Sequence, residues 1–227
     1  VMACGGAESC ICELGIGGFA SMKALSDSED PARASIPFDK ERSGFVMGEG
    51  SGILILEEYE HAVKRGATIL GEVAGYGASC DANHMTAPLE DGSGAADCMT
   101  LAIRDAGIEA CEVGYINAHG TGTPLNDKGE TKAVKLAFGE HSKELLISST
   151  KSMTGHLLGA SGAIEAVMAI KALEDQFAPP TVGYKVPDDE CDLKICPNEG
   201  VAFDSEYAMS NSLGFGGHNA SLIFKRV

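Results

Sequence analysis

Apolar and polar positions alternate between two periods over residues 67–227. Short apolar runs with the period of a strand are followed by stretches with the 3.6-residue period of a helix. The pattern predicts strands near 69–76, 113–118 and 145–148, and helices near 94–106, 127–138 and 155–173. This alternation favours an α/β fold with a mixed, mostly parallel sheet covered by helices.

Two of these helices have a periodic apolar face. On the first, the apolar positions are Ala95, Ala96, Met99, Ala102 and Ile103; along the last, they are Leu158, Ile164, Val167, Met168 and Leu173. We expect these side chains to pack against the sheet.

The first 66 residues and the end of the chain follow other patterns. Residues 1–8 resemble a strand ending in a turn, and 9–45 are rich in Gly, Ser, Asp and Pro. A buried strand over 52–56 and a short charged helix over 57–65 end at Gly66, where we place a boundary between domains 1–66 and 67–227. Near the end, two short strands, 207–211 and 220–225, are expected to be antiparallel.

Composition narrows the class of protein. With 44% apolar and 22% charged residues and no apolar run of 18, the 227-residue chain reads as globular, without a membrane span. Its formal charge of -16 opposes binding to nucleic acid, although Lys23, Lys64 and Arg65 offer a local basic patch for an acidic protein, or are simply solvated. Eight cysteines without paired spacing are typical of a reduced, cytoplasmic protein.

The first candidate for chemistry is the loop that follows the strand 113–118. His119 opens this loop, Gly120 and Gly122 let its backbone bend, and Thr121 and Thr123 offer hydroxyl groups. Ligands of open α/β sheets bind at such carboxyl ends of strands. A structural role for His119 remains the alternative.

A second loop of the same kind carries His156, predicted at the start of a helix, where the helix dipole would keep its imidazole neutral. Lys151 supplies a cation nearby. Asp127 and Glu130 share one helix face and are expected to hold Lys151, or else only to complement their own helix dipole. Both histidine loops should reach the same edge of the sheet.

The third candidate is the glycine-rich turn 214–217, in which Phe215 is the one bulky side chain. Such a turn can present backbone N–H groups to an anion while the ring opens or closes a pocket; a plain hairpin is the alternative. The glycines near Gly15 follow no apolar strand, so a dinucleotide site is disfavoured, and the remaining histidines form no recognisable metal set.

Three motifs together resemble a known family. They are Asn117-Ala-His-Gly-Thr-Gly-Thr-Pro124, Lys151-Ser-Met-Thr-Gly-His156 and Asn211-Ser-Leu-Gly-Phe-Gly-Gly-His-Asn219. With the segment Phe38-Asp-Lys-Glu-Arg-x-Gly-Phe45, they are similar to the β-ketoacyl-acyl carrier protein synthase II family of condensing enzymes. The resemblance covers essentially the whole chain.

The resemblance implies a thiolase-like fold and a decarboxylative Claisen condensation with malonyl-acyl carrier protein in fatty-acid elongation. By the matching motifs, His119 and His156 would stabilise the enolate, and Lys151, Asp127 and Glu130 would form the supporting charge network. For substrate, Thr121 and Thr123 would hold the phosphopantetheine arm that arrives on the carrier protein, Phe215 would gate the acyl pocket and contribute to the oxyanion hole, and Lys23 would help to dock acyl carrier protein.

The sequence also departs from the family. Nothing corresponds to the turn that bears the nucleophilic cysteine, which lies upstream of the Gly-Gly-Ala-Glu8 motif. We therefore expect a carboxyl-terminal portion of a longer enzyme, inactive in condensation by itself. Its missing amino-terminal half would normally complete the sheet of residues 1–66 and supply most of the homodimer interface of the parent.

The resemblance implies no resident organic cofactor and no catalytic metal. It does imply a monovalent cation held near Asn117, Glu165, Ser210 and Asn219, although these residues are equally suited to a structural hydrogen-bonded cluster. Leu213 and Gly122 are conservative departures, of which Leu213 bears on the shape of the pocket.

Two other functions remain to be weighed. A non-catalytic partner subunit of the same fold, like a chain-length factor, has no need of both His119 and His156. A thiolase-type acyltransferase that uses coenzyme A is disfavoured because the two-histidine pattern lacks a second catalytic cysteine.

Overall fold

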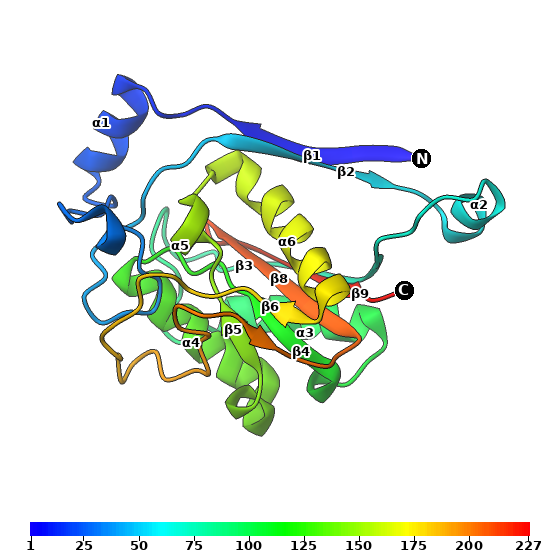
Figure 1. Cartoon of the computed structure of the whole chain (residues 1–227). Helices are drawn as coiled ribbons and strands as arrows, with labels where there is room; N and C mark the ends of the chain where they lie inside the picture. Colours follow the sequence, from blue (N-terminus) through cyan, green and yellow to red (C-terminus); the bar gives the residue numbers. More distant parts are fainter.

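The computed structural model describes all 227 residues and arranges them in four layers (Figure 1). The layers are a two-stranded sheet, one long helix, a five-stranded sheet and a pair of helices. The strands are β1 Met2–Glu8, β2 Gly50–Leu56, β3 Glu72–Cys80, β4 Val113–Asn117, β5 Leu146–Ser148, β6 Phe177–Ala178, β7 Val201–Ala202, β8 Tyr207–Gly214 and β9 His218–Lys225. The α-helices are α1 Glu13–Ser21, α2 Tyr59–Lys64, α3 Ser93–Ala106, α4 Pro124–Phe138, α5 Lys151–Thr154 and α6 Ser161–Asp175. The short 3-10 helices are η1 Pro31–Arg33, η2 Ala110–Glu112, η3 Gly139–Lys143 and η4 Leu158–Ala160.

The five-stranded sheet has the order β3-β9-β8-β4-β5 and is mixed. Strand β4 runs parallel to β5 and β8, whereas β9 runs antiparallel to β8 and β3. The predicted α/β class and the antiparallel ending are therefore confirmed. A predominance of parallel pairs is not observed, because two of the four strand pairs in this sheet, β8–β9 and β9–β3, are antiparallel.

The core on one side of this sheet lies under α3 and α4. All five apolar positions predicted for the face of α3 are buried there, in contact with side chains of β4, β8 and β9. Gly77 on β3 allows the helix to approach, since a Cβ at that position would lie 2.0 Å from the carbonyl oxygen of Cys98.

The core on the other side lies under α6, and here the predicted face is wrong. Of the five apolar positions expected to pack, only Leu173 is buried, and Val167 is 36% exposed. The buried face instead consists of small residues, Ala166, Ala169 and Ala172. Alanines fit on this face because α6 lies between two sheets and contacts both, so that small side chains are needed for the close approach on either side (Figure 1).

The two-stranded sheet pairs β1 and β2 in antiparallel register, and its inner face rests on α6 and η4. Gly6 and Gly52 make this contact possible, because a Cβ on either would meet backbone atoms of Gly159 or Ala163. On the outer face, Ile53 and Ile55 are about 60% exposed. An apolar sheet face is thus left open to solvent.

Two further elements differ from the predictions. Helix α1 forms within residues 9–45, for which the sequence predicted no helix; its glycines obscure any helical period, and none of its residues is buried. The helix expected over 155–173 begins later, because Gly155 with φ 71 ends α5, a short 3-10 turn follows, and α6 spans only Ser161–Asp175.

The two predicted domains contact one another. Val46 and Gly48 bond to the main chain of His156, and Ser35 donates to the carbonyl of Lys151. The boundary near Gly66 stays a prediction. All eight cysteines are free thiols, and none of the helices has the length and apolar character needed to cross a membrane.

The contact between β3 and α3 generates a stability prediction. We expect Gly77→Ala to lower the free energy of unfolding by about 1–3 kcal/mol, because the added methyl group displaces the helix backbone. The matched control is Gly17→Ala in α1, where a Cβ meets no atom within 4 Å and helix propensity should add about 0.5–1 kcal/mol. Urea unfolding of both variants measures the difference; equal effects would contradict the packing argument.

Candidate active site

His119 lies just beyond the carboxyl end of β4, as predicted, and is 6% exposed. Its main-chain N–H and that of Gly120 donate to the two carboxylate oxygens of Glu130, each at 2.8 Å. Gly120 has φ 38, and a Cβ there would lie 2.6 Å from the side chain of Ser149. The loop is therefore held tightly, and only glycine fits after the histidine.

His156 lies in the connection between α5 and η4, not at the start of a helix as predicted. Its main chain is fixed by Val46 and Gly48, with hydrogen bonds of 2.7 and 2.9 Å. The expected helix dipole is absent at this position because α6 begins five residues later. Another cause must keep this imidazole neutral.

Hydrogen bonds fix the same tautomer in both rings. Nδ1 of His119 lies 3.3 Å from the ammonium of Lys151, which can only donate. Nδ1 of His156 accepts from the N–H of Leu158 at 3.2 Å and lies 2.9 Å from the hydroxyl of Ser161. In each neutral ring the proton is therefore on Nε2, which is a donor.

The two rings are close and remain neutral. Their centroids lie 5.3 Å apart with an interplanar angle of 85°. Burial, followed by the charge of Lys151, lowers the pKa of His156 to about 3. Burial and the same ammonium hold the pKa of His119 well below its usual value. Two neutral N–H donors at such close range suit an oxygen that becomes negatively charged during a reaction.

The carboxylate partner of Lys151 is Glu165 of α6, which corrects the prediction that Asp127 and Glu130 hold this lysine. Lys151 and Glu165 are 1% and 2% exposed. Burial raises the pKa of Glu165 to about 7, and Lys151 opposes that rise. No local spacing links residues 151 and 165, so only the tertiary structure reveals the pair.

Asp127 and Glu130 instead hold the loop of His119. Glu130 accepts hydrogen bonds from the two main-chain N–H groups described above and, at 3.2 Å, from the side-chain amide of Asn211. Asp127 accepts from the N–H of Gly122 at 3.2 Å. Both carboxylates are buried, and neither lines the cavity described below, so they act by positioning the backbone of this loop.

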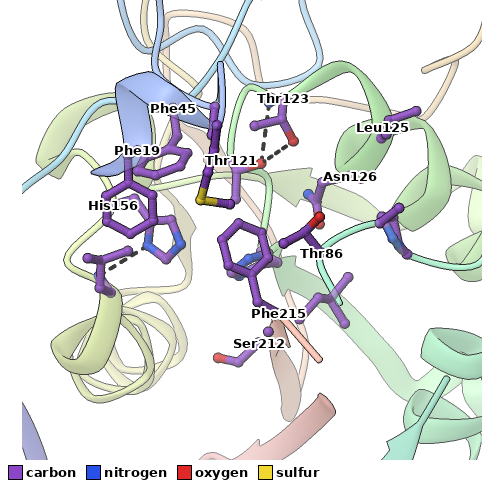
Figure 2. A pocket seen from close by; sticks show the side chains of 18 of the residues that line it. Phe19, Phe45, Thr86, Thr121, Thr123, Leu125, Asn126, His156, Ser212 and Phe215 are labelled. Atoms are coloured by element: carbon purple, nitrogen blue, oxygen red, sulfur yellow. Dashed lines mark hydrogen bonds between the residues drawn. The ribbon is translucent and has the colours of Figure 1, made fainter. Parts of the chain in front are cut away.

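The two histidines both line a cavity of about 500 Å³. Figure 2 shows this cavity from close by, with His156 among the labelled residues. Thr121, Thr123, Phe215 and Lys23 line it together with His119 and His156. The hydroxyl groups of Thr121 and Thr123 are 2.9 Å apart, and Lys23 is exposed at the edge. The volume is that of a typical small-molecule site.

The turn of Phe215 closes the hairpin β8–β9, which confirms the hairpin, and Phe215 lines the cavity, while its roles in gating and in anion binding stay predictions. Phe215 is 51% exposed, and Figure 2 shows its ring extending into the cavity. Gly216 and Gly217 have φ of 86 and 77, and the N–H of Gly216 donates to the carbonyl of Met85 at 2.7 Å.

Sequence reasoning missed the aromatic contact of His156. The ring of Phe45 meets that imidazole edge to face at 5.3 Å and contacts Phe19 in the same way at 5.2 Å. The segment 38–45 was noted for its resemblance only. Nothing in its spacing indicates that it reaches a histidine more than 100 residues away.

Three of the four residues implied for a monovalent cation lie together. Asn117 and Ser210 are paired in register, and the Asn117 amide lies 3.4 Å from the carbonyl of Glu165. Asn219 does not lie in this group: it is near the start of β9, opposite Leu213, and its side-chain amide donates to Asp81 at 2.7 Å. Oε2 of Glu165 is buried without a partner, which suits a hard cation. No cluster of three or more His, Cys, Asp or Glu is arranged to hold a metal.

Sequence comparison identifies the family. The model of the β-ketoacyl synthase carboxyl-terminal domain matches residues 70–185, and that of the amino-terminal domain matches 1–62. The chain belongs to the β-ketoacyl synthase family. Both histidine loops lie within the carboxyl-terminal match, while Phe45 and Val46 lie within the amino-terminal one.

The curated relatives of this synthase chain are longer proteins. It is 55% identical over 226 residues to 3-oxoacyl-[acyl-carrier-protein] synthase 2 of Synechocystis and 53% identical over 228 residues to that of Vibrio harveyi. These matches cover 99% and 100% of this chain but 54% and 55% of the relatives. The chain thus spans about half the length of the curated relatives it matches.

Solved structures of synthases confirm the thiolase-like fold. A ketosynthase of a type II polyketide system, in complex with its acyl carrier protein, matches with a TM-score of 0.97 and 43% identity, over 100% of this chain and 56% of that one. A β-ketoacyl synthase from Burkholderia phymatum matches with a TM-score of 0.94 and 42% identity, over 100% and 54%.

The neutral state of His156 predicts how stability depends on pH. Its pKa is about 3 in the folded chain and about 6.5 in the unfolded one, so below pH 6.5 only the unfolded chain gains this proton. Between pH 7 and 5.5 the free energy of unfolding should therefore fall by about 1 kcal/mol more in the wild-type chain than in His156→Asn. Guanidinium unfolding at both pH values measures this; an equal fall in both proteins would show that His156 is not buried as a neutral ring.

Proposed function

We propose that this chain is the carboxyl-terminal portion of a fatty-acid elongation enzyme that condenses an acyl thioester with malonyl-acyl carrier protein. The observation that carries the proposal is the pair of neutral imidazoles, both with Nε2–H, beside one cavity. The names of the curated relatives support the same reaction.

The two histidines would act on the malonyl group. When the bond between the carboxylate and the methylene carbon breaks, carbon dioxide leaves and the electron pair moves onto the thioester as an enolate. The Nε2–H groups of His119 and His156 would donate to that enolate oxygen. Since both rings are neutral beforehand, they contribute most in the transition state, where charge develops.

The supporting residues divide into two groups. Lys151, held by Glu165, fixes the tautomer of His119, while Asp127 and Glu130 fix its backbone. For the substrate, the hydroxyl groups of Thr121 and Thr123 would hold the phosphopantetheine arm. Phe215 would gate the acyl pocket and complete the oxyanion hole of the condensation step, and Lys23 would meet the acidic carrier protein.

The proposed partners follow from the open surfaces and from relatives. A related ketosynthase has been solved with its acyl carrier protein, which supports the same class of partner here. The outer face of β1 and β2, with Ile53 and Ile55 exposed, would be covered by the amino-terminal half of the parent enzyme. We also propose a homodimeric, cytoplasmic parent without an organic cofactor, with a monovalent cation beside Glu165.

A chain-length-factor-like partner subunit is the second candidate, and ketosynthase and chain-length-factor complexes occur among the structural matches. The built site argues against it. A subunit without catalysis has no use for two tautomer-fixed histidines and a buried lysine, each of which is costly to maintain in the interior.

The proposal predicts a partial activity for this chain. We expect it to convert malonyl-acyl carrier protein to the acetyl form, with a proton from water replacing the lost carboxylate, and to form no condensation product, because none of its residues matches the family nucleophile. His119→Asn or His156→Asn should lower this decarboxylation about 10²–10³-fold. Mass spectrometry of the carrier protein follows both reactions.

The matched control is His61→Asn, in the exposed helix α2, which should leave the rate unchanged. Condensation by the 227-residue chain would contradict the assignment of the nucleophile to the missing half. A version extended upstream by about 190 residues should condense. A folded extended protein without this activity would favour the partner-subunit function.

A further inference from the structure

The segment 36–45 lies directly against the loop of His119, although the proposed function gives it no role. Phe38, fully buried with φ 65, places a ring carbon 3.0 Å from the position of a Cβ on Gly120. The carbonyl oxygen of Gly44 lies 3.1 Å from the corresponding position on Gly122. The loop is therefore enclosed by a segment more than 70 residues earlier in the chain.

Asp127 connects this segment to the loop. Its Oδ1 accepts from the N–H of Gly122 at 3.2 Å, and its Oδ2 accepts from the N–H of Phe38 at 2.8 Å. Both bonds are strongest when the carboxylate is ionised, because protonation removes the charge and part of the acceptor capacity. Asp127 is fully buried, and burial raises its pKa. A nearby cation is therefore needed to favour the charged form of this carboxyl group.

Arg42 is the cation that faces Asp127. Its Nε lies 3.5 Å from Oδ2 of that carboxylate, and its side chain is 4% exposed. The guanidinium also donates to the carbonyl of Asp39 at 2.9 Å and to Asp188 at 2.5 Å. Arg42 Nε makes no hydrogen bond, so its contact with Asp127 is an ion pair, and the side chain that donates a hydrogen bond to the Asp127 carboxylate is the neutral Asn126. The charge balance of this carboxylate therefore rests on Arg42.

We propose that Arg42 is a positioning residue of the active site, which keeps Asp127 ionised and thereby holds the loop of His119 in place. The effect passes from the guanidinium to the carboxylate, then to the N–H groups of Gly122 and Phe38, and so to the imidazole. Its catalytic consequence rests on the proposed function, whereas its structural consequence does not.

This assignment gives a role in the active site to residues of the amino-terminal domain. Arg42 and Phe38 belong to the part matched by the amino-terminal domain, yet they stabilise a site built on the carboxyl-terminal one. Residues 36–45 are then an integral part of the enolate-stabilising site.

The test uses the full 227-residue chain with Arg42→Gln, Arg42→Lys and the double change Arg42→Gln with Asp127→Asn. The matched control is Arg65→Gln, which breaks an exposed ion pair with Glu57. Circular dichroism confirms folding. The direct readout is the ¹⁵N spectrum of the imidazoles from pH 4 to 8, in which the His119 signals are identified by their loss in His119→Asn.

In Arg42→Gln we expect the His119 Nε2 signal to move and to titrate within this range, because the loosened loop admits water. Arg42→Lys, which keeps the charge, should restore most of the wild-type signal. The double variant removes the buried carboxylate charge together with its cation, so it can be measured in place of Arg42→Gln if that variant does not fold. Its His119 Nε2 signal should lie nearer to that of the wild type than the signal of Arg42→Gln does. A folded Arg42→Gln with an unchanged His119 signal would overturn the proposal, as would an equal shift in Arg65→Gln.

Kinetics separate this inference from the function. If the wild-type chain decarboxylates malonyl-acyl carrier protein, Arg42→Gln should lower kcat by roughly 10- to 100-fold with KM changed less than about threefold, because the donor is displaced while substrate contacts remain. A raised KM at constant kcat would overturn the positioning role. If the wild-type chain shows no decarboxylation, the proposed function fails, and the spectra still decide the role of Arg42.

Discussion

The buried ion pair between Lys151 and Glu165 is the interaction on which the site depends. Neither charge is tolerable alone in the interior, so the two residues must stay together. Lys151 begins α5 after β5, and Glu165 lies on α6, so the pair joins two successive parts of the chain. The same ammonium donates to His119 on the loop after β4. One contact therefore fixes three elements and one tautomer.

The two histidines of the site are neutral because they are buried beside the ammonium of Lys151, and a helix dipole is not the cause. The sequence suggested a helix dipole at His156, yet that ring lies in a connection with no helix behind it. Its Nδ1 instead accepts from Leu158 and faces Ser161, which leaves Nε2–H for the cavity. The neutral imidazole inferred from the sequence agrees with the lowered pKa of His156, while its physical cause is different.

The layered packing explains why small residues recur near the site. Helix α6 lies between two sheets and carries alanines where a surface helix would carry larger side chains (Figure 1). The loop of His119 lies between Phe38 and Ser149, where only glycine fits. Such close approach leaves little room for movement of the imidazole. It also makes the site sensitive to residues distant in sequence, such as Arg42.

The sequence by itself determined the order of the larger elements of residues 67–227, namely β3, α3, β4, α4, β5, α6, β8 and β9, the inward face of α3 and the two histidine loops. These features depend on local periodicity and on glycines at strand ends, which a single sequence displays. It did not reveal α5, β6 or β7. Only the tertiary structure decided that Glu165 pairs with Lys151, that Asp127 and Glu130 hold a backbone loop, and that Phe45 packs on His156. Each of these contacts joins residues in different elements, so the free energy that selects them comes from burial in the assembled fold, and no local spacing encodes it.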